Sequence, residues 1–312
     1  MLMHSRLWRV LHAFVCLVSL AVPLHAQTID DGIMLGKRDL QTGTVYSHES
    51  WDEYWEGAVR RANGNIGRVT TQTSAWTANY GLTNWLNVIA TVPYVRTRAS
   101  QGVLHGIGGF QDITIGAKYN FLEKTSTSYG SLRAMAVVAA GIPLTDYNPE
   151  LPPLSIGSGS TRVSWRGTVN FQSNPGWFLN YSTAYTWRSQ TELDRPYYYT
   201  DDQFVMSSQV DMPNAFDHVA SAGYMRRRLM TAVSFSQQRT LGGGDIRRQD
   251  MPFVSNRMNF FKVGAMVMAP VPKLRGLLFN FTVDQTMDGR NVGLASTFTT
   301  GLLYRFQAGP TR

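Results

Sequence analysis

Apolar and polar residues alternate almost without error from Phe110 to Phe121. Successive side chains of a β-strand point to opposite faces, so such a segment has two chemically different sides. One side carries Ile113, Ile115, Ala117, Tyr119 and Phe121, and the other carries Asp112, Thr114, Gly116, Lys118 and Asn120. The segment therefore predicts a strand with one apolar face and one face that bears charge.

The same alternation recurs along the chain and predicts about 12 strands. They cover residues 38–50, 66–80, 85–95, 109–121, 130–143, 162–172, 177–188, 215–225, 229–240, 256–269, 275–284 and 294–306. None has a 3.6-residue apolar stripe long enough for a core helix. Segments of this length suit strands that cross a membrane at a tilt, which need roughly 9–11 residues.

The connections between these segments alternate in length. Short ones are 81–84, 122–129, 173–176, 226–228 and 270–274, and long ones are 51–65, 96–108, 144–161, 189–214, 241–255 and 285–293. Outer-membrane barrels have short periplasmic turns and long extracellular loops, and closure pairs every backbone group that faces hydrocarbon. We therefore predict an all-β fold, a transmembrane antiparallel up-and-down β-barrel over residues 38–306. Residues 27–37 are expected as a short periplasmic segment and 307–312 as a tail.

Residues 1–26 have the form of a secretory signal peptide. Arg6 and Arg9 precede an apolar run that ends near Pro23, and a cut after Ala26 fits, with a second site after residue 21. Cys16, the only cysteine, lies inside this segment. Export argues against a nucleic-acid partner despite the formal charge of +8. We expect the cell outer membrane of a Gram-negative bacterium as the location.

Composition separates the barrel from a soluble β-sandwich, which also alternates. Charged residues are 16% of the chain, below the roughly 25% that is usual in soluble domains. Aromatic residues are abundant at 12% and gather near the predicted strand ends, as interfacial girdles require. Loop lengths in a sandwich need not alternate, so both observations favour the barrel.

Four stretches between residues 76 and 121 form a connected pattern. They are YGLTNWL at 80–86, VPY at 92–94, GFQDI at 109–113 and GAKY at 116–119. This pattern resembles the meta-pathway-of-phenol-degradation family, outer-membrane β-barrel transport proteins of Gram-negative bacteria. The resemblance continues more loosely to Phe306, and it implies uptake of phenolic or other small aromatic compounds.

With the apolar face toward lipid, the opposite face lines the lumen. Nine charged residues are predicted to line a pore there: Asp112, Lys118, Arg133, Arg162, Arg166, Arg188, Lys262, Asp284 and Arg305. Seven are basic and two are acidic, an excess that attracts anions between low-dielectric walls, and arginine forks bind carboxylates. The alternative is that the basic side chains pair with Asp112, Asp284 and loop acids and fill a narrow barrel.

We expect a monomeric or weakly oligomeric channel for passive uptake of small solutes, aromatic or anionic compounds among them. Residues 27–37 are too few for an energy-coupling plug domain. Expected partners are outer-membrane lipid, the barrel-insertion machinery, periplasmic chaperones and the solutes. No enzyme activity and no cofactor are predicted. No metal site is predicted either, because the acidic loop around Asp201 and Asp202 lacks a geometry that fixes calcium.

Two other functions stay open, an outer-membrane hydrolase of lipase or protease type and a structural or adhesive barrel. A serine hydrolase needs a base beside its nucleophile. His218 and Ser221 are three residues apart on one predicted strand, which puts them on opposite faces, and His105 lies in a glycine-rich loop. The long loop 189–214, with three consecutive tyrosines, either folds into the lumen or binds ligands outside.

Overall fold

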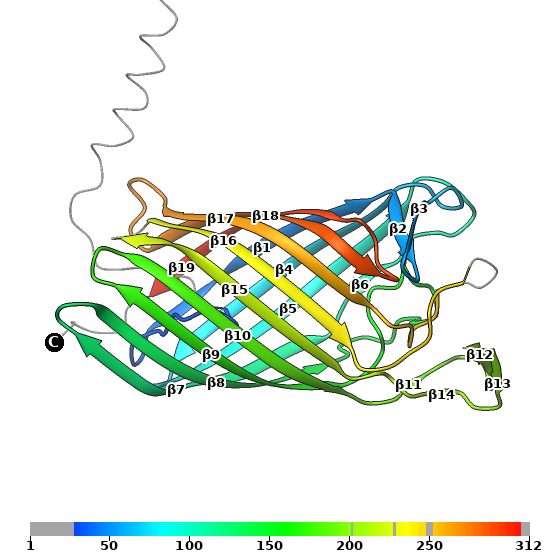
Figure 1. Ribbon diagram of the computed structural model, residues 1–312, viewed down its shortest axis with the longest axis horizontal. Coiled ribbons are helices and arrows are strands. Elements are labelled where there is room, and N and C mark those ends of the chain that lie inside the picture. The colour runs from blue at the N-terminus through cyan, green and yellow to red at the C-terminus, as the bar shows by residue number, and fades with distance from the viewer. Residues whose placement is uncertain (1–27, 201, 227–228, 248–251, 307–312) are drawn as a thin grey trace, which may run out of the picture.

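Twelve long antiparallel strands close into a barrel in the computed structural model, which describes residues 28–200, 202–226, 229–247 and 252–306 (Figure 1). The strands are β1 (Leu40–Trp51), β4 (Val69–Gly81), β5 (Leu86–Ala99), β7 (Ile113–Ser126), β8 (Gly130–Ile142), β9 (Arg162–Ser173), β10 (Trp177–Arg188), β15 (Ala215–Arg226), β16 (Leu229–Thr240), β17 (Asn259–Pro270), β18 (Leu277–Arg290) and β19 (Ser296–Phe306). Each pairs with its neighbours in sequence, and β1 pairs with β19. The predicted strand count and the closed barrel are confirmed.

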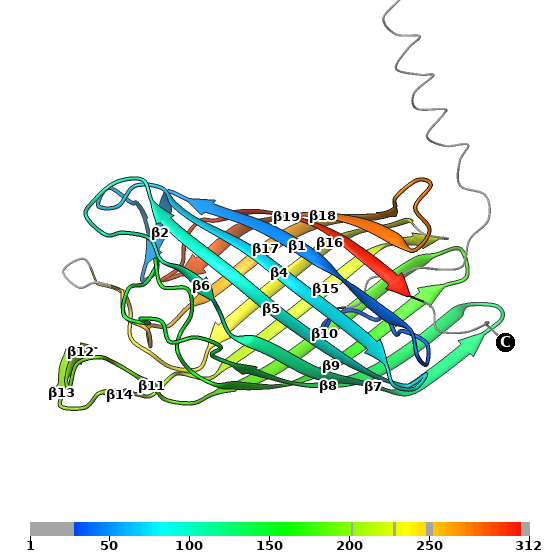
Figure 2. The ribbon, with the colours of Figure 1, turned by 180° about the vertical axis from the view of Figure 1, so that it is seen from behind.

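Seven short strands belong to the long loops. They are β2 (Glu53–Glu56), β3 (Val59–Ala62), β6 (Gly108–Phe110), β11 (Thr191–Glu192), β12 (Tyr198–Thr200), β13 (Gln203–Val205) and β14 (Gln209–Val210). The long loops gather at one end of the barrel, the long-loop end, and the tight turns at the other, the short-turn end (Figures 1 and 2). Both β1 and β19 reach the short-turn end, as an even strand count requires.

Within the part of the chain that the structure describes, no helix is long and apolar enough to cross a membrane.

The two faces of β7 differ as their residues predict. Ile115, Tyr119 and Phe121 point outward with 49%, 43% and 57% of their surface exposed, whereas Lys118 on the other face is fully buried. The alternating segment is not one continuous strand, because β6 ends at Phe110 and β7 begins at Ile113. A bulge between Asn120 and Leu122 also shifts the pairing of β7 with β8.

Outward-facing aromatic rings form contacts near both ends of the barrel. Trp85 with Tyr119 and Trp177 with Tyr224 meet edge to face near the short turns, at ring-centre distances of 5.3 and 5.2 Å. Trp165 stacks on Tyr185 at 6.1 Å near the long loops. Aromatic side chains at two levels with apolar residues between them are typical of a membrane-embedded barrel, and they place this one in an outer membrane.

Three long loops meet at Asn291, whose φ of 57° is unusual for a residue with a side chain. Its carboxamide oxygen accepts the N–H groups of Gly57 at 2.8 Å and Ile246 at 3.0 Å. Its amide nitrogen donates to Asp245 Oδ1 at 2.8 Å and to the carbonyl of Arg257 at 2.7 Å. The loop after β1, the loop before β17 and the loop after β18 are therefore joined at one buried side chain.

Candidate functional site in the barrel lumen

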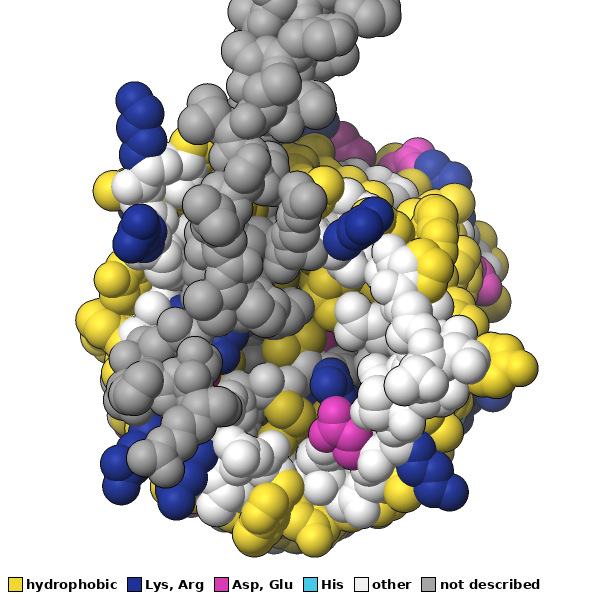
Figure 3. Space-filling view, turned by 90° about the vertical axis from the view of Figure 1, so that its left-hand side faces the viewer, with side chains coloured by type: hydrophobic (Ala, Val, Ile, Leu, Met, Phe, Trp, Pro, Cys, Tyr) yellow, Lys and Arg dark blue, Asp and Glu magenta, His cyan; other side chains and the backbone are white. Residues whose placement is uncertain are grey.

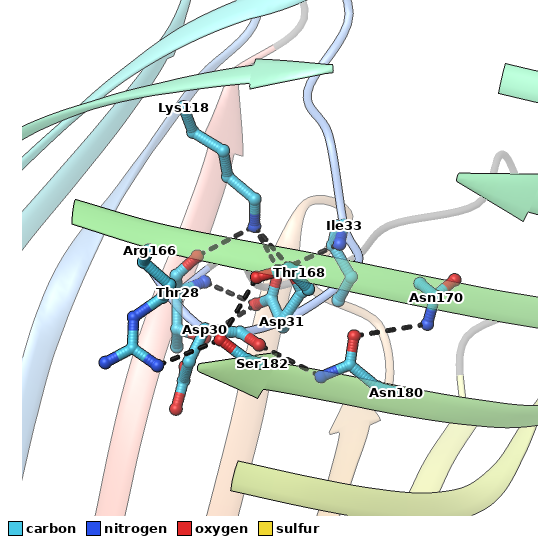
Figure 4. A network of polar contacts seen from close by, with 10 residues as sticks. All are labelled: Thr28, Asp30, Asp31, Ile33, Lys118, Arg166, Thr168, Asn170, Asn180 and Ser182. Atoms are coloured by element: carbon cyan, nitrogen blue, oxygen red, sulfur yellow. Dashed lines mark hydrogen bonds and ion pairs between the residues drawn. The ribbon is translucent and has the colours of Figure 1, made fainter. Parts of the chain in front are cut away.

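The chain before β1 enters the short-turn end of the barrel, and we call residues 28–39 the inner segment. Lys118 on β7 reaches it with a fully buried side chain. The Nζ atom donates to the carbonyls of Thr28 at 2.9 Å and Asp31 at 2.6 Å, and it pairs with Asp31 Oδ1 at 2.7 Å (Figure 4). Asn180 on β10 donates to the carbonyl of Asp30 at 2.9 Å. The inner segment is thus fixed to two strands of the wall.

Apolar packing holds the inner segment as well. Ile33 is buried in a cluster with Phe178, Met230, Met268, Leu278 and Leu303, which come from five strands. Gly32 lies so close to the wall that an added Cβ would be 2.2 Å from the Cγ of Asn170. At its end the segment carries Asp39, which pairs with Arg305 of β19. Seen from the short-turn end, the barrel opening shows hydrophobic, basic and acidic side chains (Figure 3).

The expected periplasmic segment 27–37 therefore has a more definite position within its described residues. It does not run outside the barrel but fills part of the floor of the lumen. A barrel of 12 strands is narrow, and inward side chains occupy part of it, so a short segment contacts several strands at once. That this segment lies at the periplasmic end of the barrel stays a prediction.

Two further ion pairs each join strands that are not direct neighbours. Arg166 on β9 pairs with Asp217 on β15 at 2.5 Å and also donates to Ser182 Oγ at 2.9 Å. Lys262 on β17 pairs with Glu49 on β1 at 3.3 Å. The inner wall therefore places opposite charges side by side at both sites.

The loop between β8 and β9, residues 143–161, closes over the lumen at the long-loop end. Leu154 is fully buried, and its carbonyl accepts the hydroxyl of Thr97 at 2.6 Å. Tyr147 donates to Asp112 Oδ1 at 2.6 Å and accepts the N–H of Gly159 at 3.1 Å. Burial, together with the bond to Asp112, raises the pKa of the Tyr147 hydroxyl, so it remains a donor at neutral pH. Arg162 lies 3.6 Å from Asp112.

Six of the seven predicted basic residues have an acidic partner. The pairs are Lys118 with Asp31, Arg133 with Glu123, Arg162 with Asp112, Arg166 with Asp217, Lys262 with Glu49 and Arg305 with Asp39. Among the described residues Arg188 has no acidic partner, and Asp284 has no ion pair. The geometry agrees with the alternative in which the basic side chains are neutralised, so a lumen-wide anion preference stays a prediction.

Sequence reasoning missed five of these acids: Asp31, Asp39, Glu49, Glu123 and Asp217. Glu49 and Asp217 occupy inward positions of β1 and β15, in register with the alternation of those strands. That periodicity was a usable signal. Asp31 and Asp39 carry no such signal, since the inner segment does not alternate.

His218 and Ser221 lie on opposite faces of β15 and do not form a catalytic pair. His218 points outward, where its Nδ1 lies 3.0 Å from the hydroxyl of Tyr181 and its ring stacks on Phe216. Ser221 lies on the opposite face of the same strand, as its spacing predicts. No group of three acidic, histidine or cysteine side chains among the described residues is placed to hold a metal ion. Asp201 lies outside the described residues.

The tyrosines of the loop 189–214 do not constrict the lumen. Tyr198 is buried against Phe253 with ring centres 5.3 Å apart, whereas Tyr197 and Tyr199 are half exposed. The β12–β13 hairpin that carries them projects beyond the barrel (Figure 1). The loop 143–161, by contrast, contacts the inward side chains of Thr97 and Asp112.

Comparison with known proteins identifies a family and solved structures of similar fold. The family model described as "Putative MetA-pathway of phenol degradation" matches residues 53–300. The COG4313 outer membrane channel from Pseudomonas putida F1 has a TM-score of 0.72 at 14% identity and covers 89% of this chain and 100% of its own. The translocator domain of the autotransporter NalP from Neisseria meningitidis scores 0.45 at 10% identity, covering 97% and 96%. No curated protein matches the sequence.

Proposed function

Because this chain belongs to the phenol-degradation family named above, we propose that it is a passive outer-membrane channel for small solutes, with aromatic or anionic compounds as its cargo. The observation that carries the proposal is the inward face of the 12 strands. It is lined by charged, hydroxyl and amide side chains although the barrel wall faces lipid. A lumen of this kind offers hydrogen bonds to a polar solute.

Several observations bear on the cargo and on the alternatives. The family description refers to phenol degradation, which favours aromatic compounds. The COG4313 relative is named a channel, and its likeness extends to the fold alone. The outward position of His218 keeps it away from Ser221, as their spacing predicts, and we propose no catalytic role. Insertion by the barrel-insertion machinery with periplasmic chaperones is part of the same proposal.

Planar-bilayer recordings of the refolded protein test this function. We expect small single-channel conductances with a weak anion preference. Replacing Arg162 and Arg166 together by alanine leaves the carboxylates of Asp112 and Asp217 without their basic partners, so the reversal potential in a salt gradient should move toward cation preference. Alanine at Arg96 and Arg98, which point outward from β5, is the matched control and should leave it unchanged.

Occlusion by the inner segment must be separated from the absence of a pore. A variant that displaces this segment, Gly32→Val, should conduct at least as well as the natural chain. If neither protein passes ions, and neither lets liposomes take up benzoate faster than protein-free liposomes at neutral pH, the channel function is wrong.

A further inference from the structure

We propose that Arg162 and Arg188 form a binding site for the carboxylate group of a small organic solute at the long-loop end of the lumen. The inference deepens the proposed function and depends on it only for the route by which the solute arrives. It starts from Arg188, the one predicted basic residue without an acidic partner in the described part of the chain.

Strand register puts the two arginines side by side. Arg162 begins β9, Arg188 ends β10, and they are direct partners in the antiparallel pairing of these strands. Directly opposite residues have Cβ atoms about 4.5–5.5 Å apart, so both side chains rise from the same patch of the inner wall. On the other side Arg162 pairs in register with Gly141, and a Cβ there would lie 2.4 Å from Arg162 Nε. The missing side chain of Gly141 leaves the room in which Arg162 lies.

The charges at this patch are not balanced. Two guanidinium groups rise from this patch, and the only carboxylate paired with either in the described residues is the almost fully buried Asp112, beside Arg162. One oxygen of Asp112 accepts the hydroxyl of Tyr147, and the other, Oδ2, is buried without a hydrogen bond and lies 3.6 Å from Arg162. Like charges directly opposite on neighbouring strands are destabilising. The patch therefore carries an excess positive charge that a second carboxylate would neutralise.

The shape and charge of the patch favour a monovalent carboxylate. Each guanidinium presents a planar fork that matches a carboxylate with two parallel hydrogen bonds, so two forks that rise from one patch suit one such group between them. Asp112 beside them repels a second negative charge, which disfavours a divalent anion such as phosphate. Part of the loop 143–161 lies beside this patch, since Tyr147 of the loop donates to Asp112.

Direct binding tests the site without relying on conduction. Benzoate is titrated into the full-length protein in detergent by isothermal calorimetry, with benzyl alcohol as the uncharged analogue and phosphate as the divalent anion. We expect benzoate to bind and the other two not to bind. Arg188→Gln should weaken benzoate binding by about tenfold or more, the effect of losing charge-assisted hydrogen bonds. Arg98→Gln removes the same charge from the outward face of the same end and should bind like the natural chain.

A purely structural role for Arg188 predicts a different pattern. If the residue only supports the fold, Arg188→Gln lowers the unfolding midpoint without benzoate. If it is half of an unbalanced binding site, the midpoint stays the same or rises, and the stabilisation that benzoate gives to the natural chain disappears. Absence of benzoate binding to the natural chain, or equal binding by Arg188→Gln, overturns the site even where bilayers show a conducting pore. Benzoate binding without conductance would instead contradict the channel function alone.

Discussion

At Lys118 one ammonium group holds the barrel wall and the inner segment together. Its three donors are used by two carbonyls and one carboxylate, all from residues 28–31. Removing one member of a buried, hydrogen-bonded ion pair is far more costly than losing an exposed pair, since the other charge is left without compensation. Asp31 avoids that cost only by leaving the lumen together with its segment.

Lys118→Met is therefore expected to release the inner segment and raise single-channel conductance. The unfolding free energy in lipid vesicles should fall by up to about 3 kcal/mol, less than for a trapped charge because Asp31 is free to reach water. Lys124→Met is the matched control, since Lys124 is exposed on the same strand. Unchanged conductance in Lys118→Met would show that the ion pair does not hold the segment in place.

The position of Lys118 could be predicted, but its partner could not. Alternation alone puts it on the inward face of β7, and the structure agrees. Asp31 lies 87 residues earlier in a segment without periodicity, so no local rule connects the two. The contact arises from barrel closure, which brings β7 and β10 around the same short piece of chain.

The inner segment is the element that the sequence describes least. Ile33, Met34 and Leu35 form an apolar run of three residues that follows two aspartates, a pattern too short to assign to a strand or a helix. The strands are the opposite case. Lipid on one side and polar lumen on the other impose the alternation on every strand, so all 12 are visible in the sequence.

Gly32→Val tests whether close packing keeps the inner segment inside. The first side-chain atom would overlap Asn170, and the whole β-branched group needs more room than the wall gives. We expect the segment to become accessible to added protease while the barrel stays folded. Gly64→Val is the control, since nothing lies within 4 Å of its added Cβ. If protease cleaves the two variants equally at the inner segment, the contact with Asn170 is not a restraint.

For the whole molecule, the face of the strand on which a residue lies decides how much a charge there lowers the free energy of unfolding. Val233 and Ser234 are neighbours near the middle of β16, the first pointing outward with 48% of its surface exposed and the second pointing inward. Strand count, closure and the side on which each residue lies all follow from alternation and loop length. The way the long loops pack on one another does not, because those contacts join residues far apart in sequence by hydrogen bonds without a repeating pattern.

Arginine at these two positions should have opposite consequences. Val233→Arg places a charge against hydrocarbon and is expected to cost about 2–4 kcal/mol of unfolding free energy. Ser234→Arg places the same side chain in the lumen near Asp284 and should cost much less. Urea unfolding in phospholipid vesicles measures both. Equal losses would mean that the outer surface of β16 does not face lipid.

The contacts of Asn291 affect how antibodies and phages recognise the long-loop end of this protein. Because it joins three loops that are distant in sequence, the outer face is a composite surface, and no single peptide reproduces it. Antibodies or phages that bind the folded protein are expected to recognise a conformational epitope built from all three loops. Immunisation with any one loop peptide would then yield antibodies that recognise the denatured chain and miss the intact bacterium.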